Sequence, residues 1–158
     1  METATATKNP YTVKGVKSFM GREGHGYECS VYKDGKRLGT VTDVANGGGM
    51  LQMNLKTRED EAELEAYCKA LPKLSYMHED KEHFYDNDPC IFIGGLVDKF
   101  EQMKTYKRWC KKQTVFRIDG DKEGSFRTIS AVFTDKVKAH LVKKYPDNGL
   151  YIVNEHLE

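Results

Sequence analysis

Two glycine-rich segments hold the residues best suited to bind an anion. Arg22 and His25 belong to the first segment, and Asn46, Gly47 and Gly48 form the second. Glycine lets a backbone approach a ligand closely, and successive backbone N–H groups cradle phosphate. Arg22 would pair with that phosphate, and His25 would hydrogen-bond or stack. We therefore expect the two segments to meet around a ligand at one end of a small sheet. The alternative is a pair of flexible turns.

Arg117 and Arg127 occupy like positions on either side of a loop over 119–124. If the flanking strands pair around this loop, both guanidinium groups point to one face of the hairpin. Like charges opposite one another destabilise paired strands, and an anion bound between them would offset that repulsion. The alternative is that both are ordinary exposed arginines, paired with the acidic residues of the loop.

Basic residues surround the single tryptophan near the end of an expected helix. Aromatic stacking combined with positive charge binds nucleic acid. The candidate nucleic-acid site consists of Lys104, Arg108, Trp109, Lys111 and Lys112. The alternative, which we favour, is a tryptophan anchored in the core with lysine stems packed beside it.

The remaining histidines and cysteines do not form a metal-binding or catalytic motif. His78 and His83 lie five positions apart, whereas a zinc-binding HExxH helix needs a spacing of four. The cysteines lack a CxxC pair, so we expect small core residues rather than zinc ligands or redox centres. They are Cys29, Cys68, Cys90 and Cys110. We expect no catalytic constellation, no metal and no cofactor.

The first half of the chain predicts an antiparallel sheet followed by a helix. Residues 11–20 have strand character, and residues 51–55 alternate between apolar and polar side chains. An Asp-Gly pair separates two alternating runs and is typical of a tight turn, so it predicts a hairpin of 26–33 with 36–44. Apolar residues at helical spacing, preceded by a capping threonine, predict a helix over 58–71.

The second half alternates between helical and extended patterns. Residues 72–93 show the least regular pattern, and we expect a mobile, acidic surface loop there. A glycine pair precedes an expected helix over 96–111. Residues 115–118 and 125–129 predict a second hairpin, and 135–145 a third helix. Because strands and helices segregate, we expect an α+β fold whose antiparallel sheet, built from two hairpins and further strands, packs against about three helices.

Length and charge set further limits. The chain has 158 residues, which fits a flexible tail over 1–10 and one domain over 11–158. No apolar run approaches the roughly twenty residues needed to cross a bilayer, so we expect a cytoplasmic protein. The net charge of +1 hides an asymmetry: residues 58–101 carry −7 and residues 102–158 carry +5. The negative charge of residues 58–101 favours binding to basic partners, and the positive charge of residues 102–158 favours binding to anions.

One stretch resembles a known family. The similar features are a strand, the Asp34-Gly35-Lys36 turn and the following Asn46-Gly47-Gly48 turn. Through these features, the stretch resembles a family of small uncharacterised phage and prophage proteins. The usual turn of that family is Gly-His-Gly-Gly, whereas Ala45 begins it here. The basic C-terminal part is also similar, around Val137 to Leu141. The resemblance implies a phage-encoded accessory protein in the cytoplasm of a bacterial host, where such proteins often counter host immunity.

Three functional hypotheses follow. The first is a non-enzymatic protein that sequesters a nucleotide-type signalling molecule of the host defence, as a homo-oligomer that completes the pocket between subunits. The second is an inhibitor that docks its acidic, aromatic-rich 58–92 region on a host defence or nucleic-acid-handling protein. The third is a nucleic-acid-binding module that uses the basic residues around the tryptophan.

Overall fold

A computed structural model describes residues 9–47 and 51–157 of the chain. The described part contains three α-helices and antiparallel sheets, which confirms the α+β class. Contacts between Cα atoms divide the chain into two compact units, Met1–Phe100 (unit 1) and Glu101–Glu158 (unit 2). We describe each unit by itself, and the single domain expected over 11–158 stays a prediction. The expected tail over 1–10 lies almost wholly outside the described residues.

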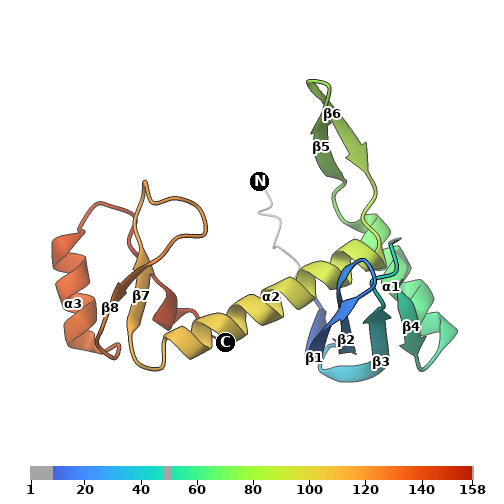
Figure 1. Cartoon of the computed structure of the whole chain (residues 1–158), viewed down its shortest axis with the longest axis horizontal. Helices are drawn as coiled ribbons and strands as arrows, with labels where there is room; N and C mark the ends of the chain where they lie inside the picture. Colours follow the sequence, from blue (N-terminus) through green and yellow to red (C-terminus); the bar gives the residue numbers. More distant parts are fainter. Residues whose placement is uncertain (1–8, 48–50, 158) are drawn as a thin grey trace, which may run out of the picture. The chain divides into compact units, whose positions relative to one another are not determined.

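Unit 1 is built on a four-stranded antiparallel sheet in which each strand pairs with the next one along the chain (Figure 1). The strands are β1 (Tyr11–Gly21), β2 (Gly24–Lys33), β3 (Lys36–Asp43) and β4 (Gln52–Leu55). Two-residue turns join β1 to β2 and β2 to β3, as expected for hairpins.

The predicted hairpin of β2 with β3 is confirmed. Its register pairs Lys33 with Lys36, so that Asp34 and Gly35 alone form the turn. Both turn residues have positive φ, 49° at Asp34 and 82° at Gly35. A two-residue turn of this kind matches the twist of the strands, and aspartate and glycine tolerate the left-handed conformation better than other residues.

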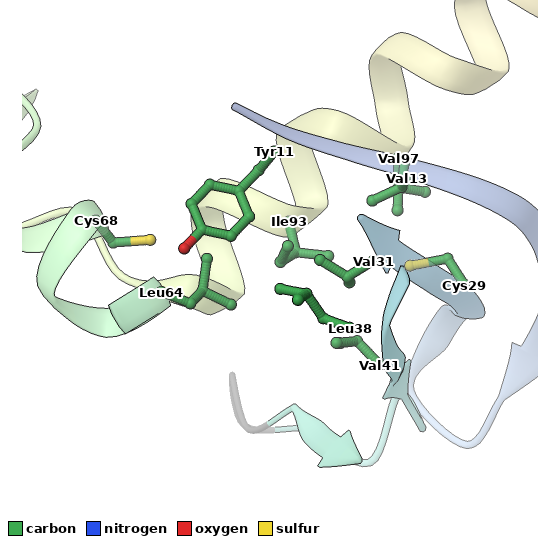
Figure 2. Packing of buried hydrophobic residues seen from close by; sticks show 10 residues of the cluster. All are labelled: Tyr11, Val13, Cys29, Val31, Leu38, Val41, Leu64, Cys68, Ile93 and Val97. Carbon is green, nitrogen blue, oxygen red and sulfur yellow. The ribbon is translucent and has the colours of Figure 1, made fainter. Parts of the chain in front are cut away.

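Helix α1 (Arg58–Ala70) covers the sheet of unit 1. It begins as the sequence predicts, because the side chain of Thr57 accepts a hydrogen bond from the backbone N–H of Asp60 at 3.1 Å. Leu64 and Cys68, one turn apart, are buried beneath it. Figure 2 shows how they meet residues from the strands and from α2. This core consists of Tyr11, Val13, Cys29, Val31, Leu38, Val41, Leu64, Cys68, Ile93 and Val97.

Helix α2 (Pro89–Trp109) begins earlier than the expected 96–111. The carboxylate of Asp88 accepts a hydrogen bond from the backbone N–H of Ile91 at 2.9 Å, and proline follows at the first helical position. Both features are standard for a helix start.

The helix is confirmed, and the glycine pair at 94–95 explains why its start was predicted too late. Glycine weakens a helix by about 1 kcal/mol per residue relative to alanine. Ile93 and Val97, on either side of the pair, are buried in the core of unit 1. Their burial stabilises the helix by more than the glycines cost, since a buried aliphatic side chain contributes about 2 kcal/mol.

The irregular loop expected over 72–93 is wrong. Strands β5 (Leu74–His78) and β6 (Lys81–Tyr85) form an antiparallel hairpin there, and in the described chain they pair with no other strand. The turn residues Glu79 and Asp80 have positive φ, 49° and 59°. This geometry favours Asn-Gly, so the sequence carries no local turn signal. The hairpin stands clear of α1 and of the four-stranded sheet (Figure 1).

Unit 2 contains a second, smaller sheet in the order β8-β7-β9. Strands β7 (Thr114–Arg117) and β8 (Arg127–Ile129) form the second predicted hairpin, in a different sheet from the first. The C-terminal segment forms β9 (Tyr151–Ile152) and a 3₁₀ turn (Val153–Glu155). The Asn154 side chain joins it to β7 by accepting from the Val115 backbone N–H at 2.8 Å.

Helix α3 (Asp135–Lys144) packs on the sheet of unit 2. The side chain of Thr134 caps it by accepting from the backbone N–H of Val137 at 3.3 Å. Phe116, Leu141 and Ile152 are the buried centre of a small core, surrounded by partly buried apolar residues.

Candidate functional site

The two glycine-rich segments of unit 1 do lie together. The backbone N–H of Glu23, in the turn between β1 and β2, donates to the carbonyl oxygen of Ala45 at 2.9 Å. Ala45 has a φ of 54°, and its N–H donates to the carboxylate of Asp43. Gly47 approaches the first turn so closely that a Cβ there would clash with the carboxylate of Glu23.

This arrangement places a carboxylate where the anion was expected. Arg22, His25 and Asn46 of the two turns are exposed, and Gly48 lies outside the described residues. A carboxylate repels a phosphate, so the side chain of Glu23 opposes anion binding between the two turns. The glycine-turn site of Arg22, His25, Asn46, Gly47 and Gly48 stays a prediction, and its geometry favours a structural contact between turns.

Arg117 and Arg127 do not share a face, so this expectation is wrong. The register pairs Arg127 with Phe116, and Arg117 is the next residue along β7, so its side chain points the other way. Arg127 donates to both carboxylate oxygens of Asp121, at 2.9 and 3.1 Å. This pairing lowers the pKa of Asp121. Arg117 instead stacks over the ring of Tyr151, 4.7 Å from its centroid.

The basic residues around the tryptophan are exposed at the end of α2 and just beyond it: Lys104, Arg108, Lys111 and Lys112. Trp109 itself is 38% exposed. Its ring centroid lies 6.3 Å from that of Phe126, in an edge-on arrangement, and 5.9 Å from that of Tyr106, in a tilted one. Trp109 is therefore not the buried core anchor that we favoured. Its ring is partly held by two aromatic neighbours, which leaves less of its face for stacking on a base.

Four of the large exposed apolar side chains of unit 1 lie on the β5–β6 hairpin: Tyr76, Met77, Phe84 and Tyr85. Alternate residues point to opposite faces, and one face holds a row of rings. Tyr76 stacks on His83 at a centroid distance of 5.3 Å, and the ring of Tyr85 lies 5.9 Å from that of Tyr76. The ring of His78 lies 6.1 Å from that of His83. The two histidines are thus cross-strand neighbours in a hairpin.

The opposite face of the hairpin is also apolar. Met77 and Phe84 are diagonal neighbours there, 68% and 62% exposed. Tyr76 on the first face is 53% exposed. Single exposed apolar residues are ordinary, whereas several gathered on one projecting element are typical of an interaction surface.

Negative charge surrounds these apolar residues. Residues 72–88 carry two lysines and five acidic side chains, a net charge of −3 with neutral histidines. Lys73 forms an exposed ion pair with Asp86 at the base of the hairpin, at 3.6 Å. The acidic turn residues Glu79 and Asp80 are exposed at the tip.

The cysteines lie as small core or near-core residues. Burial raises the pKa of the Cys29 and Cys68 thiols to about 11, and it also raises that of Cys90 and Cys110. A nucleophilic cysteine needs a lowered pKa, so these thiols are unsuited to that chemistry at neutral pH. Within residues 9–47 and 51–157, no three potential ligands among His, Cys, Asp and Glu come together as a metal site.

The acidic aromatic region was expected to be a loop, but it forms a hairpin. Neither 74–78 nor 81–85 alternates strictly between apolar and polar residues, so the local signal for two strands was weak.

No protein-family model, curated protein or solved structure that we compared matches this chain. Among the helices that the structure describes, none is both long enough and apolar enough to cross a membrane.

Proposed function

We propose that this chain is a non-enzymatic binding protein that docks its β5–β6 hairpin on another protein. The partner has a basic surface with an apolar groove. The exposure of Tyr76, Met77 and Phe84 on both faces of one projecting hairpin carries this proposal. It corresponds to the second sequence hypothesis, in which the acidic 58–92 region recognises a partner.

The hairpin has the physical properties of an element that is completed by binding. A two-stranded sheet is only marginally stable in water by itself. Both outer strand edges of β5 and β6 are unpaired by other strands of the described chain, so a partner strand can add to either edge. Burial of the exposed rings against the partner would then provide the hydrophobic stabilisation that the hairpin does not receive from the core of unit 1.

Charge selects the kind of partner. The net charge of −3 over 72–88 is concentrated around the tip and the base of the hairpin. Such a rim accelerates encounter with a basic surface and disfavours acidic ones. Under the resemblance to phage proteins, this partner would be a host defence or nucleic-acid-handling protein, and the chain would act as its inhibitor in the bacterial cytoplasm.

Site-specific photocrosslinking in bacterial cells tests the proposal. A benzophenone amino acid is placed at Phe84, and the matched control carries it at Val132, which is 58% exposed in unit 2. We expect a covalent adduct with a different protein from the Phe84 position and none from the Val132 position. The adduct is identified by mass spectrometry, and that protein is then purified for kinetic measurements.

Charge reversal provides the second part of the test. Glu79→Lys, Asp80→Lys and Glu82→Lys together should slow association with the identified protein at least about tenfold at low salt. The control reverses three exposed carboxylates elsewhere, Glu28, Glu123 and Asp147, which changes the net charge equally. Equal slowing by both triple variants refutes steering by the hairpin. The absence of any adduct, or an adduct only with a second copy of this chain, refutes the proposed partner.

A further inference from the structure

A groove in unit 2 lies between strand β8 and helix α3, and its rim is basic. Lys136, His140 and Lys144 are spaced four residues apart on α3, so they form one stripe along the helix. All three line the groove, and Arg127 of β8 lines it as well. The described lining includes these four basic side chains and no aspartate or glutamate.

The floor of the groove is apolar. Phe116 and Leu141, both buried, contribute to it, together with the partly buried Ile129 and Val137. The cavity measures about 540 Å³, within the usual range of roughly 300–1,000 Å³ for small-molecule sites.

An aromatic ring ends the groove. Tyr145, half-buried, follows α3, and its centroid lies 5.8 Å from that of Phe116. The guanidinium of Arg127 and the ammonium of Lys144 lie over this ring, at 6.0 and 5.5 Å from its centroid. A flat aromatic ligand can bind in such surroundings, because its ring can stack on an aromatic side chain and form cation–π contacts with the guanidinium and ammonium groups.

Asp121 offsets the charge of Arg127, but the described lining contains no carboxylate to offset Lys136 and Lys144. Asp121 accepts hydrogen bonds from the Nε and one terminal nitrogen of Arg127, which leaves the other terminal nitrogen of the guanidinium outside that pair. The ion pair of Lys138 with Glu155 involves residues outside this lining. Several like charges around one cavity repel each other, and a bound anion relieves that repulsion.

We propose that this groove binds a small phosphate-bearing ligand with an aromatic ring, of the nucleoside phosphate class. The phosphate pairs with the lysines of the α3 stripe and with Arg127, and the base lies on the apolar floor beside Tyr145. Only Arg127 belongs to the ligand site expected from the sequence. The groove is independent of the hairpin and adds a second binding activity to the proposed function.

Calorimetric titration of the full chain tests the groove. The probes are the four ribonucleoside 5′-monophosphates, each titrated separately, with inorganic phosphate and adenosine as partial probes. We expect at least one monophosphate to bind with a Kd below about 1 mM and at least about tenfold more tightly than phosphate or adenosine. Binding by none of the four at this concentration overturns the proposal, and so does equal binding of inorganic phosphate.

Matched lysine variants on α3 locate the site. Lys144→Ala should weaken the bound monophosphate at least about tenfold, and Lys144→Arg should retain most of its affinity. Lys143→Ala is the control, since Lys143 is exposed on the same helix but does not line the groove. Equal weakening by Lys143→Ala and Lys144→Ala indicates non-specific attraction to the helix and refutes the groove. Tight binding of a single-stranded oligonucleotide without monophosphate binding supports the third sequence hypothesis instead.

Discussion

Tyr11 offers a sharp test of the packing in unit 1. Its side chain is 1% exposed and its ring lies among those of Tyr67, at 5.1 Å, and Phe92, at 6.0 Å. The hydroxyl group is buried with no hydrogen-bond partner among the described residues. Burial also raises the pKa of Tyr11, so the group stays neutral. Most core substitutions destabilise a protein, but Tyr11→Phe should stabilise this one.

The magnitude follows from two opposing effects. A buried hydroxyl without a partner costs about 1–3 kcal/mol. Removal of one oxygen leaves a void of roughly 10–15 Å³, which costs about 0.3 kcal/mol at 24 cal/mol per Å³. The free energy of unfolding of Tyr11→Phe should therefore exceed that of the unmodified chain by about 1–2 kcal/mol. For a chain of this size, this corresponds to a rise in Tm of roughly 2–8 °C.

Urea denaturation and calorimetry measure the effect. Tyr27→Phe should also stabilise the chain, because the Tyr27 hydroxyl is likewise buried without a partner. Tyr67→Phe is the control: its ring belongs to the same cluster, but its hydroxyl is not buried without a partner, and a change within about 0.5 kcal/mol is expected. A loss of more than about 1 kcal/mol in Tyr11→Phe would show that the hydroxyl is hydrogen-bonded and that the reasoning is wrong.

Three further predictions concern unit 1. Leu64→Ala, at a position that is 0% exposed, should lower the free energy of unfolding by about 2–5 kcal/mol in urea titrations; a loss below 1 kcal/mol would argue against the core of Figure 2. The thiols of Cys29 and Cys68 have a pKa of about 11 in the folded chain, whereas the ordinary value is 9.0. As the pH rises, these thiols therefore lose their protons at a lower pH in the unfolded chain than in the folded chain. Stability should thus be unaffected below pH 8 and fall between pH 9 and 11, by on the order of 1 kcal/mol per pH unit for each thiol; Cys→Ala variants at both positions should flatten this dependence. Finally, Glu79→Asn combined with Asp80→Gly should slow hydrogen exchange of the β5–β6 amides, since these residues prefer the observed turn; unchanged exchange would contradict the turn geometry.

The sequence predicts those elements whose signal is local. The β2–β3 hairpin rests on Asp34 and Gly35, which adopt the positive φ that such a turn demands. Helices α1 and α3 begin at threonines whose side chains cap the first turn. In each case the determining residues lie within a few positions of the element, so no knowledge of the tertiary structure is needed.

The elements that the sequence analysis missed depend on contacts between distant residues. Helix α2 passes through a glycine pair because Ile93 and Val97 are buried against the sheet and α1. The β5–β6 hairpin lacks a turn signal at Glu79 and Asp80. The site residues show the same limit. Arg117 and Arg127 lie on opposite faces because the register pairs Arg127 with Phe116, and this register cannot be derived from a single sequence.

The attachment of the β5–β6 hairpin has an evolutionary consequence. Its ends join α1 to α2, and both helices are held by the core of unit 1, through Leu64 and Cys68 on one side and Ile93 on the other. None of the residues between these helices belongs to that core. Residues 72–88 can therefore diversify, or be exchanged for the hairpin of a relative, while the scaffold keeps its sequence. Under the proposed function, the recognition element is therefore separable from the core that stabilises unit 1.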